Sequence, residues 1–180
     1  GRLFCGNGTA QLVKRSEWRD SGSGVLHDLG SHILDTWRYW FGEISGNFSL
    51  VSARAFEDRA WDHVVFSQES GDFRIEAEVT LCSWRNSFSA DIMGSEGSLH
   101  IDSLCKWGPA SLTVRRRARP SGAPMEERKT LIEHDPTWKD EWEDFILNAS
   151  AKVETDLSTD VWVCEQLDRL YIEGRNRKWV

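Results

Sequence analysis

The sequence lacks the features that mark several common classes of protein. No apolar run approaches the roughly 18 residues of a transmembrane helix, and no signal peptide opens the chain. The four cysteines are widely spaced, without a C-x-x-C pair or paired histidines of the zinc-finger kind. This spacing favours free, mostly buried thiols in a reducing compartment. We therefore expect a cytoplasmic protein that does not enter a membrane.

Positive charge is also scarce. The 22 Lys and Arg stand against 29 Asp and Glu, which gives a formal net charge of -7. Such a balance argues against a nucleic-acid or anionic-membrane surface, and favours small molecules or other proteins as partners. Arg115, Arg116, Arg117 and Arg119 form the only dense basic run, and we interpret it as a solvated edge strand in preference to a phosphate site.

A dinucleotide-binding fingerprint is missing as well. Such a fold shows a strand, a G-x-G-x-x-G turn and a helix in succession. The nearest match, GNGTAQ at residues 6–11, lacks the third small residue and precedes no plausible β-α-β unit. It predicts a loop or bulge after a strand-like RLF and no cofactor site in this chain. Because the chain begins at Gly1 and enters that strand directly, we expect it to be the C-terminal part of a longer protein.

What the chain does have is a long helical pattern at residues 21–42, which ends at Gly42 as a C-cap glycine. At 100° per residue, one narrow arc of this helix is polar and the opposite half is apolar. We expect the helix to be buried with its polar stripe. The stripe consists of Asp28, His32, Asp35 and Tyr39; the apolar half consists of Val25, Leu26, Leu29, Ile33, Leu34, Trp37, Trp40 and Phe41.

After Gly42 the pattern changes to alternating, β-rich segments separated by turn residues. The short connections at residues 69–72 and 94–97 predict antiparallel hairpins. We expect an open-faced, mostly antiparallel sheet of about five or six strands with helices packed on one face. The predicted strands are residues 47–56, 62–68, 73–84, 87–93, 97–102 and 111–119.

The C-terminal third is predicted to be mainly helical. Residues 120–127 are interpreted as a loop, and Asp135-Pro136 as the start of a helix that buries Trp138, Trp142, Phe145 and Ile146. A last helix opens at Ser158 or Thr159 and stops at Gly174. A sheet with helices at both ends of the sequence is an α+β arrangement, in one domain over residues 1–180.

Three interpretations of Asp28 and His32 remain open at this stage. The two residues can form a satisfied core pair without chemistry. They can also act in general acid/base catalysis, because Asp28 lies one turn before His32 and can orient its ring. A metal site would need His27 with Asp28, His32 and Asp35, but His27 lies far around the helix from His32, and we expect no metal. The ten tryptophans, which show no repeat, suit either core packing or stacking on sugar rings.

The stretch GSGVLHDLGSHILD at residues 22–35 resembles the G-G-G-x-x-x-D-x-G-x-H-x-x-D signature of the Gfo/Idh/MocA oxidoreductases, the glucose-fructose oxidoreductase and inositol dehydrogenase family. SEWR at residues 16–19 and MGSEGSLHID at residues 93–102 resemble further parts of the same pattern. Ser23 departs from it, because it replaces the middle glycine. The family's E-K-P lysine and its nucleotide-binding half have no counterpart in this chain.

The resemblance implies the C-terminal, substrate-binding and oligomerisation domain of an enzyme that uses NAD or NADP to oxidise a sugar, a cyclitol or a related polyol. It implies that His32 accepts the hydroxyl proton, that Asp28 orients His32, and that Asp35 binds substrate hydroxyls. We expect a homodimer or homotetramer formed through the sheet, and an isolated chain without activity. Further candidates for substrate binding are Trp18, Arg19, Asp62 and His63.

Two functions from other classes stay open. The first is a non-catalytic binding or dimerisation module with the same fold, in which Asp28 and His32 are structural. The second is a metal-dependent hydrolase.

Overall fold

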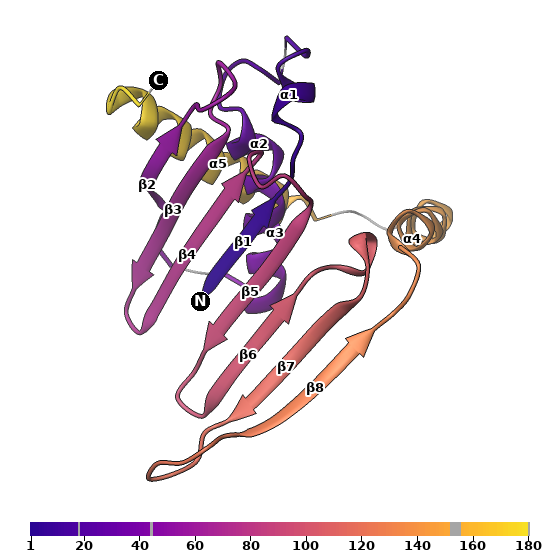
Figure 1. Ribbon diagram of the computed structural model, residues 1–180. Coiled ribbons are helices and arrows are strands. Elements are labelled where there is room, and N and C mark those ends of the chain that lie inside the picture. The colour runs from indigo at the N-terminus through magenta and orange to yellow at the C-terminus, as the bar shows by residue number, and fades with distance from the viewer. Residues whose placement is uncertain (18, 44, 152–155, 180) are drawn as a thin grey trace.

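The computed structural model contains one eight-stranded sheet with helices on one face (Figure 1). It describes residues 1–17, 19–43, 45–151 and 156–179. The helices are α1 (Ala10–Val13), α2 (Val25–Asp28), α3 (Gly30–Phe41), α4 (Thr137–Ala151) and α5 (Ser158–Asn176), with a short 3-10 helix at Cys105–Trp107. The strands are β1 (Arg2–Gly6), β2 (Ser49–Arg54), β3 (His63–Ser70), β4 (Phe73–Thr80), β5 (Ser87–Met93), β6 (Gly97–Asp102), β7 (Ala110–Arg116) and β8 (Met125–Leu131).

The strand order is β2-β3-β4-β1-β5-β6-β7-β8. Strand β1 lies in the middle, parallel to β4 and antiparallel to β5, while every other neighbouring pair is antiparallel. The α+β class and the hairpins β3–β4 and β5–β6 agree with the sequence prediction. The prediction of five or six strands was wrong, because β1 joins the sheet between β4 and β5 and because β8 was missed.

Strand β8 falls partly in the segment that we interpreted as a loop. Its sequence, MEERKTL, has no apolar alternation, and all seven residues are exposed. It is held at the sheet edge by its backbone pairing with β7 and by cross-strand charge pairs such as Arg115 Nε to Glu126 Oε2 at 2.7 Å. Arg115 therefore lies on β7, the strand next to the edge. The segment that we predicted to be an edge strand is paired with β8 on its outer side.

The core lies between the helices and strands β1 to β5. Alternation along β4 places Ile75, Ala77 and Val79 toward the helices and the intervening charged residues on the other face. Trp61, which is 1% exposed, contacts both ends of the helical layer: its backbone oxygen accepts from Val25 N at 2.8 Å, and its Nε1 donates to the oxygen of Trp179 at 3.0 Å. Figure 1 shows α2, α3 and α5 together behind this part of the sheet.

The predicted helix at residues 21–42 is real but divided. It breaks at Leu29 into α2 and α3, and ends at Gly42 with φ +71°. The apolar half packs into the core as expected. The expectation of a buried polar stripe was wrong: Asp28 is half-buried, whereas His32, Asp35 and Tyr39 are exposed. The stripe faces outward because the apolar half alone fills the contact with the sheet and α5.

Helix α4 was predicted correctly as a helix and wrongly as buried. Its apolar side chains Trp138, Trp142, Phe145 and Ile146 are 73%, 63%, 59% and 44% exposed. Figure 1 shows why, since α4 stands away from the helical layer beyond β8.

The prediction of mostly buried cysteines was wrong. All four cysteines are free, but only Cys5 is buried.

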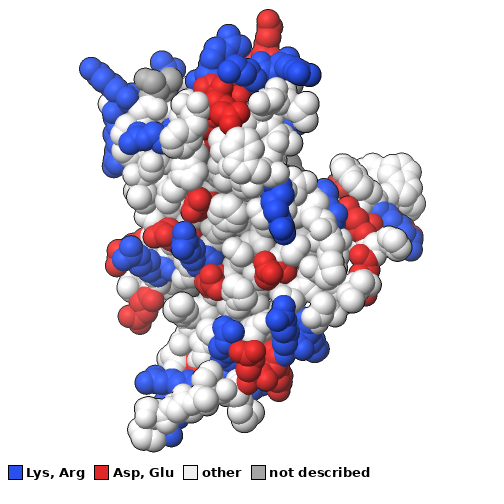
Figure 2. All heavy atoms as spheres, in the orientation of Figure 1, with Lys and Arg blue, Asp and Glu red and all other residues white. Residues whose placement is uncertain are grey.

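The sheet face opposite the helices is open. Figure 2 shows side chains of both charge signs interspersed over the face turned to the viewer. Several are paired across strands: Arg2 Nη2 lies 3.3 Å from Glu78 Oε2, and His100 bonds to Asp91 through Nδ1. Within the described residues, no helix is long and apolar enough to cross a membrane.

Candidate active site

A hollow of about 480 Å³ opens beside the start of α2, and we call it the Asp28 pocket. Four parts of the chain form it: the loop before α2, α2 itself, Val13 at the end of α1, and Leu81 directly after β4. This volume is in the range of small-molecule sites. The lining residues are Val13, Arg19, Ser21, Gly22, Ser23, Gly24, His27, Asp28 and Leu81.

Gly24 shapes the loop that carries this pocket. Its φ is +52°, and a Cβ at this position would lie 2.2 Å from the backbone oxygen of Trp61. Only glycine can adopt this conformation at such close approach without strain. The loop is thereby drawn against the core, and α2 starts directly above the pocket.

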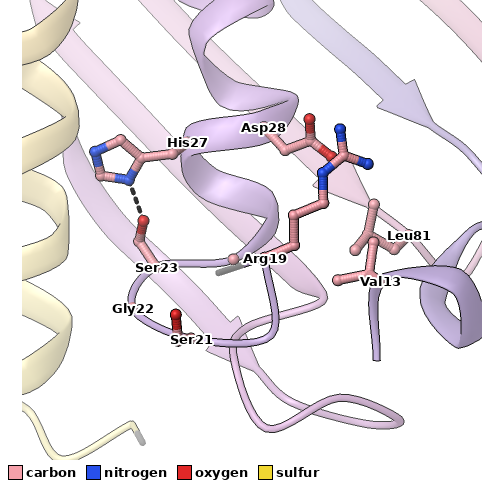
Figure 3. Close-up of a pocket in the computed structure, with 9 residues that line it drawn as sticks. Val13, Arg19, Ser21, Gly22, Ser23, His27, Asp28 and Leu81 are labelled. Atoms are coloured by element: carbon pink, nitrogen blue, oxygen red, sulfur yellow. Dashed lines mark hydrogen bonds between the residues drawn. The ribbon is translucent and has the colours of Figure 1, made fainter. Parts of the chain in front are cut away.

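Ser23, the departure from the family pattern, does not have a positive φ and therefore needs no glycine. Its side chain is buried, and its hydroxyl shares a hydrogen bond with Nδ1 of His27, four residues later (Figure 3). The replacement thus adds a contact that fixes the imidazole ring of His27.

His27 faces α5, away from Asp28 (Figure 3). Its ring meets the ring of Tyr171 edge-on at 6.5 Å, and its Nε2 lies 3.9 Å from Asp168 Oδ1. Burial lowers the pKa of His27, and the charge of Asp168 opposes this effect only in part. Ser23, His27 and Asp168 match a catalytic triad in composition, but 3.9 Å is too long for the hydrogen bond that would hold the imidazole tautomer.

The structure brings two of the predicted site residues together. Arg19 and Asp28 both line the pocket, and Figure 3 shows the Arg19 side chain extending toward the carboxyl group of Asp28. Burial together with the negative charge of Asp28 raises the pKa of the Cys5 thiol to about 11, so this thiol is neutral. Asp28 is the acidic side chain that lines the pocket.

His32 and Asp35 lie on α3, beyond the break at Leu29. Both are exposed, and neither lines the Asp28 pocket. No hydrogen bond or ion pair joins Asp28 to His32, both of which the structure describes. Asp28 and His32 therefore belong to the same outward surface of α2 and α3. The pocket lies at the Asp28 end of this surface.

The remaining predicted site residues are not part of this pocket. Trp18 lies outside the described residues. Asp62 is fully buried and accepts hydrogen bonds from the backbone nitrogens of Phe56, Glu57 and Asp58, so it closes its own loop and is not available to a ligand. His63 is half-buried at the start of β3, with its ring 5.9 Å from that of Phe56.

Sequence reasoning missed the contributions of Ser23 and His27 to the pocket. The i, i+4 spacing of a hydroxyl and an imidazole across a helix start was available as a signal. Among the residues that the structure describes, no group of three or more His, Cys, Asp or Glu side chains is arranged to hold a metal ion. No tryptophan among the described residues lines the Asp28 pocket.

Comparison with known protein families gives a match to the GFO/IDH/MocA C-terminal domain over residues 3–100. The chain belongs to this family. The match covers more than half of the chain and includes α3 as well as the loop and α2 that line the Asp28 pocket, and it confirms the resemblance seen in the sequence. No curated protein matches the sequence.

Solved structures of oxidoreductases share the fold. UDP-N-acetylglucosamine 3-dehydrogenase GnnA from Acidithiobacillus ferrooxidans aligns with a TM-score of 0.70 and 16% identity over 96% of this chain and 52% of its own. A structure titled as an NADPH-dependent oxidoreductase from Desulfitobacterium hafniense aligns with a TM-score of 0.69 and 15% identity, over 98% of this chain and 54% of its own. Levoglucosan dehydrogenase in complex with NADH and levoglucosan aligns with a TM-score of 0.51 and 21% identity, over 76% and 39%. The chain thus spans about half the length of the first two structures.

Proposed function

We propose that this chain is the substrate-binding and oligomerisation domain of an NAD(P)-dependent oxidoreductase that acts on a sugar, a cyclitol or a related polyol. The observation that carries the proposal is the Asp28 pocket, an open hollow of about 480 Å³ formed by the segment that holds the family signature. Two of the similar structures are dehydrogenases whose titles name a sugar derivative, which supports the substrate class.

Each polar group of the site has a role in this proposal. His32 accepts the proton of the substrate hydroxyl, since a neutral imidazole suits this task near neutral pH. Asp28 stabilises the imidazolium that results, and Arg19 and Asp35 hold neighbouring hydroxyls. Trp18 and His63 stay predicted substrate contacts without further support.

The exposure of His32 fits a site that a second domain completes. A covering domain would exclude water from around the exposed His32 ring and strengthen its electrostatic attraction to Asp28. We infer that the parent protein supplies this cover together with the nicotinamide cofactor, because β1 leads into the four-residue helix α1 and not into a β-α-β unit. A nicotinamide cofactor held there would supply the acceptor for the hydride that leaves the substrate carbon.

The direct test is turnover by the parent protein, meaning the longer protein to which this domain is proposed to belong. With NAD or NADP and a panel of sugars and cyclitols, we expect the absorbance of the reduced cofactor to rise with at least one substrate. The isolated residues 1–180 serve as the control and should give no turnover. A parent without an upstream nucleotide-binding domain, or one inactive across the panel, contradicts the proposal.

The open sheet face is the surface proposed for self-association. Ser89 on β5 lies on it between Phe4 and Asp102 of the neighbouring strands, and no helix covers it in the described structure. We expect the parent to elute as a dimer or tetramer in size exclusion with light scattering, and Ser89→Arg to shift it toward monomer, since a bulky cation would lie inside the contact. Ser95→Arg in the exposed β5–β6 turn is the matched control. An unchanged mass for Ser89→Arg rules out this face.

The second candidate function is a non-catalytic module with the same fold. The missing hydrogen bond between Asp28 and His32 favours it. It predicts self-association without any cofactor reduction by the parent, so the turnover test separates the two candidates.

A further inference from the structure

A second hollow, of about 450 Å³, lies directly beside the Asp28 pocket. Ser21 and Gly22 line both hollows, so only this short stretch of loop separates them. The wall on the other side is also shared, because Tyr171 lines the second hollow while its ring meets the ring of His27 from the first. The two hollows are therefore adjoining parts of one surface depression between the loop and α5.

Three cations line this second hollow, which we call the basic pocket: Arg59, Arg175 and Lys178. Asp20 is its one acidic lining residue, so three positive side chains and one negative side chain give a local charge of +2 in a chain of net charge -7. Concentrated positive charge in a concave site of an acidic protein attracts anions.

Asp20 serves to position one of these cations. It is 3% exposed and accepts hydrogen bonds from the backbone nitrogen of Arg59 at 2.6 Å and from its Nε at 2.8 Å. Burial alone would raise the pKa of Asp20, but these hydrogen bonds and the Arg59 charge lower it, so the carboxylate stays ionised. The two terminal amino groups of Arg59 remain available to a ligand.

The other two cations come from the end of α5. Arg175 lies over the ring of Tyr171, with its guanidinium carbon 5.9 Å from the ring centroid. Lys178 follows the helix with φ +56°, which turns the chain back at this point. Neither side chain has a carboxylate within ion-pair distance among the described residues. Guanidinium and ammonium groups without a carboxylate partner, placed around one hollow, suit an oxyanion.

We propose that the basic pocket binds an anionic substituent of the substrate, a phosphoryl or carboxyl group, while the sugar ring occupies the adjoining Asp28 pocket. This inference rests on the proposed function, because it treats the two hollows as one substrate site. It narrows the substrate class to acidic sugar derivatives, such as sugar phosphates, nucleotide sugars or sugar acids.

The test measures binding by calorimetry in the parent protein, with inorganic phosphate, glucose 6-phosphate, glucuronate and neutral glucose as probes. The variants are Arg175→Gln, Lys178→Gln and the double replacement. Arg169→Gln is the matched control, since Arg169 is exposed on the same helix and does not line the basic pocket. Circular dichroism melting of each variant verifies that the fold is retained.

We expect each single replacement to weaken binding of the preferred anionic probe about tenfold and the double replacement about a hundredfold, as for loss of charge-assisted hydrogen bonds. Arg169→Gln should change the affinity for this probe by less than about twofold. A stronger loss for glucose 6-phosphate identifies a phosphoryl group, and a stronger loss for glucuronate a carboxyl group. Equal affinity of wild type and double variant for all anionic probes, or equal affinity of the wild type for glucose and glucose 6-phosphate, overturns the inference.

The outcomes for the two proposals are separable. If the double variant loses anion binding but no probe is oxidised, the basic pocket stands and the dehydrogenase function fails. If neutral sugars are oxidised at the same rate by wild type and double variant and no anion binds, the function stands and the basic pocket is not a substrate site.

Discussion

Replacing His32 by alanine in the parent protein is expected to lower kcat for sugar oxidation by roughly two to four orders of magnitude, the usual contribution of a general base. The proton of the hydroxyl must leave as hydride departs, and the ring of the nearby His27 is turned toward α5. KM should change little, because His32 acts mainly on the reacting proton.

Asp28→Asn tests the partner group in the same assay. The amide keeps the shape of the side chain but cannot stabilise a cationic imidazole, so we expect a loss in kcat. Tyr39→Phe is the matched control on the same outward stripe, because Tyr39 is 85% exposed and has no assigned role. A His32→Ala enzyme that keeps turnover within about twofold would refute the catalytic role and favour the non-catalytic module.

The second large effect concerns stability. Asp58 is 8% exposed, and neither of its carboxyl oxygens has a hydrogen-bond partner in the described structure. Burial, and next the charges of Asp20 and Asp62, raise the pKa of Asp58 from 3.8 to about 6. The folded protein therefore favours the protonated carboxyl, whose stabilising contribution is complete below pH 3.8 and is lost as the pH rises through about 6.

Asp58→Asn should consequently stabilise the protein above pH 6, since it removes a buried charge that no group satisfies. A shift of this size corresponds to a gain on the order of 3 kcal/mol in the free energy of unfolding at pH 8, falling to about zero near pH 4.

Urea unfolding of wild type and variant at pH 4, 6 and 8 measures this difference. Asp72→Asn in the exposed turn between β3 and β4 is the control and should change stability by less than about 0.5 kcal/mol at every pH. If the free energy of unfolding differs between Asp58→Asn and wild type by the same amount at all three pH values, the ionisation of Asp58 does not destabilise the folded protein.

The elements with apolar periodicity were predictable. Strands β5 and β6 have the predicted bounds, and the apolar half of the helix at residues 21–42 packs where the pattern places it. These segments bury one face each, and burial of a regular face leaves a regular trace in the sequence. Strand β8 has no such trace, because backbone pairing and charge pairs hold it at the edge.

The site was predictable only in part. The signature identified Asp28 and the family, and a single sequence could go no further, because pocket walls come from distant segments. Leu81 reaches the Asp28 pocket from the end of β4, and Arg59 and Lys178 meet beside it although 119 positions separate them in the chain. Only folding brings such residues within reach of one ligand.

By itself the sequence determined the α+β class, the helical segments that contain α2 to α5, the hairpins β3–β4 and β5–β6, and the family, since each depends on local periodicity, turn residues or a contiguous motif. Only the tertiary structure decided that β1 enters the middle of the sheet, that the polar stripe faces outward, that the apolar side chains of α4 are exposed, and that three cations line a hollow beside the Asp28 pocket. The physical reason is that side-chain pattern specifies which face of an element avoids water, whereas its neighbours are selected by contacts between segments far apart in the chain.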